Sequence, residues 1–339
     1  MAAPATRVNK KALKGGYSSA SNLTATVFGS TGFLGKYLVS KLGERGVRLK
    51  LPVRCGEVYT RDLRVMADLG GVDFRRGSIR SLDHIADAVE GSQIVINLLG
   101  RTQTGETRRW SFEDVHTHFP AVLAELCAEH KVEQLIHVSG LGASTDAPSA
   151  WARSKALGEA QVLEAFPQAT IVRPATLYGE EDSSLNRLAH FSRHFPFVPL
   201  LDGGLAKTQP TYVLDVANAI FALLGNVEAP GKVFELGGPK VFTHAELANY
   251  VARVIGDTPP GLSVPRPVAL AAAMGLQLVP NPWVTVDQLI HDASDVLVSP
   301  MALGYADLGI KTADLEETSA RWLHMYKKKS NFIEDGVVI

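Results

Sequence analysis

The sequence is poor in cysteine, has no long uninterrupted apolar run and carries almost no net charge. Its two cysteines, Cys55 and Cys127, are too few for a disulfide framework or a zinc cluster, and they suit a reducing compartment. The most apolar stretch, 268–280, contains Gln277 and is shorter than the roughly 20 residues that span a bilayer, so it suits a membrane surface or a partner. A formal net charge of −1 argues against a nucleic-acid partner, which requires a broad basic face.

The composition and the hydrophobic pattern are those of an α/β protein. Hydrophobic residues make up 46% of the chain and charged residues 20%, as in folded globular proteins. Short β-rich runs predict strands over Thr24–Phe28, Arg48–Val53, Val72–Phe74, Gln93–Leu99, Gln134–Val138 and Ala169–Val172. Helical periodicity separates them over Phe33–Leu42, Leu63–Leu69, Leu82–Val89, Pro120–His130 and Trp151–Phe166. Strands that alternate with helices imply a parallel sheet with right-handed crossovers.

This alternation predicts a Rossmann-type doubly wound parallel sheet over residues 23–175. After Arg173-Pro174 the pattern loosens and proline and glycine become frequent, so we expect a smaller, mainly helical C-terminal domain over residues 176–339. The sequence does not fix this boundary sharply, because a later predicted strand such as 233–236 could also join the sheet.

A basic extension precedes the first strand. Residues 1–22 contain Arg7 and three lysines, and no acidic residue occurs before Glu44. This composition is typical of a mitochondrial presequence or its remnant, and equally of a solvated basic tail.

A glycine-rich turn follows the first strand. Gly29, Gly32 and Gly35 are spaced three residues apart between a predicted strand and a predicted helix. The first glycine permits a sharp turn, the second a close approach to a pyrophosphate, and the third close helix–sheet packing. The helix then offers free N–H groups and its positive end to phosphates. The sequence therefore predicts a dinucleotide site here.

The end of the second strand indicates which dinucleotide. An NAD site has a carboxylate there for the ribose hydroxyls, whereas an NADP site has an arginine near the 2′-phosphate. Arg54 occupies this position and no acidic residue precedes it on the strand. A guanidinium binds phosphate in bidentate fashion, so Arg54 favours NADP(H) over NAD(H). The alternative interpretation is an ordinary surface arginine.

Several segments together resemble a known family. They are 26–35 (TVFGSTGFLG), 97–101 (NLLGR), 136–139 (IHVS), Arg173-Pro174 and 209–216 (QPTYVLDV). These segments are similar to the extended and atypical short-chain dehydrogenase/reductase superfamily. More narrowly, segments at 14–16, 281–285 and 306–310 resemble the NADPH-binding accessory subunits of mitochondrial respiratory complex I, NADH:ubiquinone oxidoreductase. The resemblance covers nearly the whole chain.

The resemblance implies a set of cofactor contacts. The pyrophosphate would lie on the loop Gly29, Ser30, Thr31, Gly32, Phe33, Leu34 and Gly35. The 2′-phosphate would lie at Arg54, and Ser78 and Ile79 would line the adenine. Relatives commonly carry an acid in place of Ser78. The rest of the cofactor would lie along Leu98, Leu99, Gly100, Arg101, Ser139, Pro174 and Lys155, with the lysine at the nicotinamide ribose.

The superfamily's catalytic pair, Tyr-x-x-x-Lys, is incomplete in this chain. Lys155 is present, but Trp151 stands where the tyrosine is expected. An indole N–H donates a hydrogen bond but does not transfer protons near neutral pH. The superfamily's serine commonly lies one or two positions beyond Ser139, where Gly140 and Leu141 stand. We therefore expect a bound nucleotide without catalytic residues, with Tyr178 as a weak candidate for a substitute acid.

The resemblance also implies a role. It is that of a non-catalytic accessory subunit of complex I, which binds NADP(H) structurally and supports assembly or stability where the matrix arm meets the membrane, near the quinone region. The subunit would be peripheral on the matrix side of the mitochondrial inner membrane. Its partners would be other complex I subunits or phospholipid, contacted through 259–282 and the C-terminal region with its basic run Lys327–Lys329. The alternatives are an active NADP-dependent reductase or epimerase, and an NADP(H)-responsive redox sensor.

Overall fold

The computed structural model describes residues 23–54, 56, 60–68, 70–101, 111–257, 259–277, 282, 284–327, 333–334 and 337–338. The basic extension 1–22 lies outside the described residues, as do Lys328 and Lys329. The chain divides into two compact units. Unit 1 comprises residues up to Pro174, Val213–Leu236 and Ser299–Lys311, and unit 2 comprises the rest.

Unit 1 is built on a seven-stranded sheet in which every neighbouring pair is parallel. The strands are β1 (Thr24–Phe28), β2 (Arg48–Val53), β3 (Val72–Arg76), β4 (Ile94–Asn97), β5 (Gln134–Val138), β6 (Thr170–Pro174) and β11 (Val233–Leu236). Their order is β11-β6-β5-β4-β1-β2-β3. This is the strand order of a Rossmann-type doubly wound sheet, as the sequence predicts. The central strands β1, β4 and β5 are buried almost throughout, because both faces of the sheet are covered.

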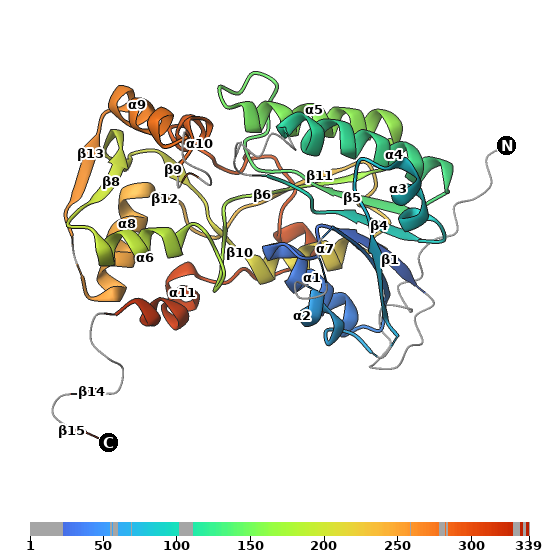
Figure 1. The fold of residues 1–339 in the computed structure, drawn as a ribbon, viewed down its shortest axis with the longest axis horizontal. Helices are drawn as coiled ribbons and strands as arrows, with labels where there is room; N and C mark the ends of the chain where they lie inside the picture. Colours follow the sequence, from blue (N-terminus) through green and yellow to red (C-terminus); the bar gives the residue numbers. More distant parts are fainter. Residues whose placement is uncertain are drawn as a thin grey trace. The chain divides into compact units, whose positions relative to one another are not determined.

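Helices cover the two faces of the sheet separately (Figure 1). The helices on one face are α3 (Leu82–Val89), α4 (Phe119–Glu129) and α5 (Ala150–Ala165), and those on the other are α1 (Phe33–Gly43), the short α2 (Arg61–Arg64) and α7 (Val213–Leu223). In α1, Leu34, Leu38 and Leu42 recur every four residues and are buried, and α1 packs directly against α7. A core that includes Phe28, Leu123 and Val162 forms under α3, α4 and α5.

Unit 2 is mainly helical. It contains α6 (Leu185–His194), α8 (His244–Ile255), α9 (Arg266–Leu276), α10 (Val286–Asp292) and α11 (Leu315–Leu323). Its strands are short and form the pairs β7 (Leu177–Tyr178) with β10 (Thr211–Tyr212), β9 (Lys207–Thr208) with β12 (Phe242–Thr243), β8 (Val198–Leu201) with β13 (Gly261–Val264), and β14 (Ile333–Glu334) with β15 (Val337–Val338). Its core includes Tyr178, Val251 and Trp322. Among the described residues, no helix combines the length and the apolar character needed to cross a membrane.

Three details of the sequence prediction differ from the structure. The predicted boundary after residue 175 agrees with the end of the first segment of unit 1, at Pro174. However, Val213–Leu236 and Ser299–Lys311 also belong to unit 1, so one boundary in the sequence does not separate the two units. The helix expected over 63–69 is only α2, since Val65 begins a turn. The strand expected to reach Leu99 ends at Asn97, because the Leu99 N–H donates to Asn97 Oδ1 (3.0 Å) and leaves the sheet ladder.

Candidate dinucleotide-binding site

The candidate site lies at the carboxyl ends of β1 and β4, where the order of the sheet reverses. These two strands are neighbours, and Phe28 pairs with Asn97 at their ends. The chain continues from β1 to β2 on one side and from β4 to β5 on the other, so the connections diverge here. Open α/β sheets bind ligands at such a switch point.

The glycine loop has the geometry that a phosphate cradle requires. Gly29 has a φ of +86°, and a Cβ there would lie 3.0 Å from the Leu98 carbonyl carbon. A Cβ at Gly35 would overlap the Gly29 carbonyl oxygen, so only glycine lets the first turn of α1 approach the end of β1 so closely. Gly32 precedes α1 without any side-chain cap, which leaves the first N–H groups of the helix available.

A buried hydroxyl in this loop supports the same interpretation. The Ser30 side chain is 1% exposed, and its Oγ has no hydrogen-bond partner among the described residues. Buried polar atoms normally have partners, so such an atom indicates a ligand or an ordered water. The cradle, the free helix N-terminus and this hydroxyl together fit a dinucleotide pyrophosphate.

The other residues predicted from the sequence lie along the same edge of the sheet. Arg54 directly follows β2 and is exposed, whereas Ser78 and Ile79 follow β3 by two and three residues and are half-buried. Leu98, Leu99, Gly100 and Arg101 continue from β4, Ser139 follows β5, and Pro174 ends β6. Parallel strands bring all these carboxyl ends to one edge, so the predicted set converges in one unit of the fold.

Lys155 reaches this edge from α5. Its side chain is buried, and its Nζ donates to the Val138 carbonyl at 3.3 Å. Burial lowers the pKa of Lys155 to about 8, against a weaker opposing effect of the Glu159 carboxylate. Glu159 is itself paired with Arg173 (Oε2 to Nη2, 2.7 Å), which in turn contacts Glu235 on β11 at 3.2 Å. The lysine charge is therefore little compensated within the protein.

Trp151 lies one helical turn before Lys155, in the position of the missing tyrosine. Its ring packs against the backbone at Gly140, where a Cβ would overlap Cη2 and lie 3.0 Å from Cζ2. The Trp151 ring also contacts His116, with ring centroids 6.4 Å apart in an edge-to-face arrangement. Ser139 Oγ is buried and has no hydrogen-bond partner among the described residues. The site thus has a hydroxyl and an ammonium but an indole where the acid is expected.

Sequence reasoning missed two buried histidines and an asparagine beside this site. Asn97 Nδ2 hydrogen-bonds His137 Nδ1 at 3.0 Å, and the Arg101 N–H donates to His116 Nε2 at 2.9 Å. Burial is the main cause that lowers the pKa of His116 to about 2 and that of His137 to about 3, so both rings are neutral. From the sequence, His116 reads as an ordinary polar residue near a helix start, and only the position of His137 inside an apolar strand marks it as unusual.

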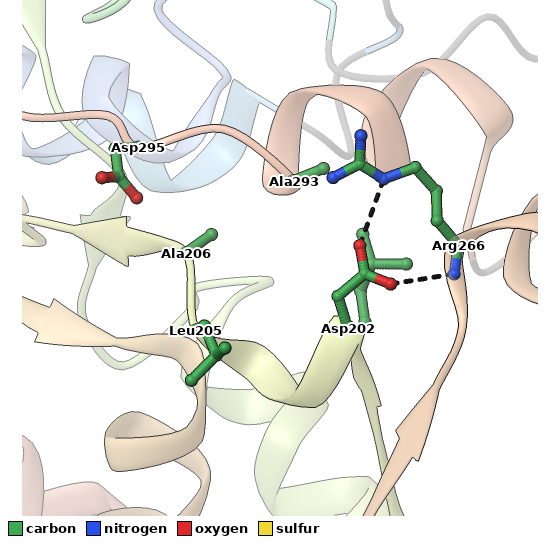
Figure 2. Close-up of a pocket in the computed structure, with 7 residues that line it drawn as sticks. Asp202, Leu205, Ala206, Arg266, Ala293 and Asp295 are labelled. Atoms are coloured by element: carbon green, nitrogen blue, oxygen red, sulfur yellow. Dashed lines mark hydrogen bonds and ion pairs between the residues drawn. The ribbon is translucent and has the colours of Figure 1, made fainter.

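Unit 2 has a separate pocket of about 240 Å³ (Figure 2). Its walls include Asp202, Arg266 and Asp295. Asp202 accepts hydrogen bonds from the backbone N–H (2.9 Å) and the Nε (3.2 Å) of Arg266, and Asp295 accepts one from the Lys207 N–H (2.8 Å). Asp202 thus joins the turn after β8 to the start of α9, and Asp295, which follows α10, is joined to β9. These bonds within unit 2 explain the charged residues of the pocket by stabilisation of that unit.

Residues 25–237 match the model of the NAD dependent epimerase/dehydratase family. The chain belongs to this family. It is 41% identical over 325 residues to the mitochondrial NADH dehydrogenase [ubiquinone] 1 alpha subcomplex subunit 9 of Arabidopsis thaliana, covering 93% of this chain and 80% of that protein. The corresponding rat protein is 40% identical, with 93% and 83% covered, so the chain also belongs to the subunit 9 family. An NADPH-dependent quinone oxidoreductase from Escherichia coli, solved with NADPH, shares the fold with a TM-score of 0.69 and 16% identity over 88% of this chain and 99% of that one.

Proposed function

We propose that the chain is a non-catalytic accessory subunit of mitochondrial complex I that binds NADP(H) as a structural cofactor. It would be peripheral on the matrix side of the inner membrane, at the junction of the matrix arm and the membrane near the quinone region. The proposal rests on the 41% identity of this chain, along 93% of its length, to the mitochondrial NADH dehydrogenase [ubiquinone] 1 alpha subcomplex subunit 9 of Arabidopsis thaliana. A bound nucleotide stabilises the fold by mass action, which links cofactor binding to assembly of the complex.

The intact cradle supports cofactor binding. The pyrophosphate would be held by the N–H groups at the start of α1 and by Ser30, and the nicotinamide ribose by Lys155. Arg54 supports NADP(H) over NAD(H), because it is exposed at the end of β2 and that strand carries no carboxylate. When bound, the nicotinamide would supply hydride chemistry, and the chain's own residues would bind and orient it.

The incomplete acid–base group supports the non-catalytic part of the proposal. The Trp151 indole does not ionise near neutral pH and so does not act as an acid, and loss of a positioned acid removes on the order of 10²–10⁴ in rate. Tyr178 lies in unit 2, where its hydroxyl donates to the Ala313 carbonyl at 3.4 Å and its ring is 1% exposed in the core of that unit. These contacts favour a structural role for this tyrosine.

The α9 helix supports a docking role for unit 2. In α9 only Ala273 is buried, and Val268, Met274 and Leu276 expose 59%, 58% and 45% of their surface. Among the described residues, most of this apolar helix is exposed, and an exposed apolar patch marks a contact surface. We propose that it contacts neighbouring complex I subunits or the membrane surface beside them.

Native electrophoresis of gently solubilised mitochondrial membranes tests the proposal. We expect this chain to migrate with intact complex I and the recovered band to contain NADP(H). Migration of the chain alone, near its own 36.5 kDa, would contradict the subunit role and favour a free-standing reductase or redox sensor.

An Arg54→Ala variant tests the choice of cofactor. Removing a charge-assisted contact to phosphate weakens binding by about 1.5–3 kcal/mol, so NADPH affinity should fall roughly 10- to 100-fold while NADH affinity stays unchanged. Isothermal titration with both nucleotides measures this difference. The exposed Arg48→Ala variant, at the opposite end of β2, is the matched control. An equal effect of Arg54→Ala on both nucleotides would contradict the proposed 2′-phosphate contact.

A further inference from the structure

The segment Leu98–Arg101 lies beside the bound nucleotide in the proposed function, yet it belongs to no strand or helix. Two of its backbone N–H groups donate to side chains. The Leu99 N–H donates to Asn97 Oδ1, which belongs to the same strand end, and the Arg101 N–H donates to His116 Nε2, which comes from a different element. The position of the far end of this segment therefore depends on His116.

The hydrogen bonds around His116 fix its tautomer. A backbone N–H only donates, so Nε2 is the unprotonated acceptor and the ring proton lies on Nδ1. Nδ1 then donates to Ser154 Oγ at 2.9 Å, and that hydroxyl donates to the Trp151 carbonyl at 2.8 Å. Every hydrogen-bonding atom of the ring is thus used, and the ring connects the segment 98–101 to the first turn of α5.

The backbone around His116 is held against α5 as well. His116 lies in the π-helical turn Asp114–His118, a form of helix that is rare and often found at functional sites. Its carbonyl oxygen packs so closely on Gly158 that a Cβ there would overlap it, and Thr117 Oγ1 donates to the Ser154 carbonyl at 3.1 Å. The Phe112 ring stacks on the imidazole, with centroids 5.3 Å apart. The imidazole therefore has little freedom to move.

The same geometry connects His116 to Lys155. A Cβ added at Gly100 would lie 3.3 Å from Lys155 Nζ and 3.9 Å from His116 Nε2, so the peptide at residues 100–101 lies directly beside the ammonium. We propose that His116 is a positioning residue for the nicotinamide half of the site. It holds this peptide at the distance from Lys155 at which both can contact the nicotinamide ribose. This inference rests on the proposed binding of NADP(H).

Three variants at His116 test the proposal. His116→Phe keeps the stacking on Phe112 but accepts no hydrogen bond, whereas His116→Gln places a carboxamide oxygen near the position of Nε2. His116→Asn, which keeps a polar group but is too short to reach the Arg101 N–H, replaces the phenylalanine variant if that variant fails to fold. His118→Phe is the matched control, because His118 lies two residues away in the same turn with its side chain 65% exposed.

The readout is the affinity of the whole chain for NADPH compared with that for 2′,5′-ADP, which lacks the nicotinamide half. We expect His116→Phe or His116→Asn to weaken NADPH binding about tenfold, the size of one lost hydrogen bond, and to leave 2′,5′-ADP affinity unchanged. His116→Gln should restore NADPH affinity, and the fluorescence of bound NADPH should change only in His116→Phe and His116→Asn.

Two results overturn the inference and are distinguishable. An equal loss of affinity for both ligands would give His116 a purely structural role and leave the proposed function intact. A wild-type chain that binds neither ligand would contradict the proposed function itself, and the positioning role with it.

Discussion

The packing of Trp151 on Gly140 leads to a prediction about two positions together. A serine at residue 140 would place its Cβ 3.0 Å from Trp151 Cζ2 and in overlap with Cη2, well inside the 3.5–4.0 Å at which carbon atoms attract. The indole would have to move by roughly 1 Å, which would disturb its edge-to-face contact with the buried His116 ring. Overpacking of this kind costs about 1–3 kcal/mol, so Gly140→Ser alone should lower the free energy of unfolding by that amount.

A tyrosine at residue 151 changes this result, because its single ring lacks the Cη2 and Cζ2 atoms that the serine would meet. Gly140→Ser should therefore cost much less in a Trp151→Tyr background, with a coupling free energy of about 0.5–3 kcal/mol. Urea unfolding of the wild type, both single variants and the double variant measures this coupling. Additivity within about 0.5 kcal/mol would refute the steric reasoning, since it would mean that the two side chains do not compete for the same space.

Three further predictions concern charge and surface. Lys155→Met removes a buried charge and should raise the unfolding free energy of the nucleotide-free chain at pH 7 by about 1–3 kcal/mol. The same variant should bind NADPH more weakly. A variant with a lower unfolding free energy than the wild type would contradict the lowered pKa of Lys155. The folded pKa values of His116 (about 2) and His137 (about 3) lie below the unfolded value of 6.5, so the unfolded chain binds more protons below pH 6.5. Stability in urea should therefore fall from pH 7 to pH 5.5, by up to about 1.4 kcal/mol per pH unit for each ring, and a flat profile would argue against neutral rings. On α9, Met274→Asp should leave the melting temperature nearly unchanged but deplete the chain from complex I on native gels, whereas Met301→Asp, also exposed but in unit 1, should do neither.

Local sequence patterns were sufficient to predict the parts of the site that lie directly after a strand of the parallel sheet. The spacing of Gly29, Gly32 and Gly35 between a strand and a helix predicts the cradle, and the same reasoning predicts that Arg54 follows β2. These features depend on neighbours in sequence and on the general geometry of parallel sheets. The structure brings the predicted residues to one sheet edge, although ligand contacts by each of them stay predictions.

Contacts between distant segments were not predictable in the same way. His116 is separated by 15 residues from Arg101 and by 38 from Ser154, and no local pattern indicates that its ring joins them. The return of residues 299–311 to unit 1 also depends on contacts between segments that are distant in the sequence. It depends on Glu235 Oε2, which accepts the Ser299 N–H at 2.8 Å, and on a further backbone bond from the Glu235 N–H to the Leu303 carbonyl.

The structure also changes how the two departures from the catalytic pattern relate to each other. In the sequence, the tryptophan at 151 and the absence of a serine at 140 are two independent differences. In the structure they are one packing arrangement, because the indole occupies the space that a side chain at 140 would need. Replacing Trp151 by tyrosine alone would therefore restore an acid but leave Gly140 without a hydroxyl. Restoring the superfamily pattern at both positions, beyond the hydroxyl that Ser139 already supplies, needs both substitutions, and the packing predicts that each is tolerated best when the other is present.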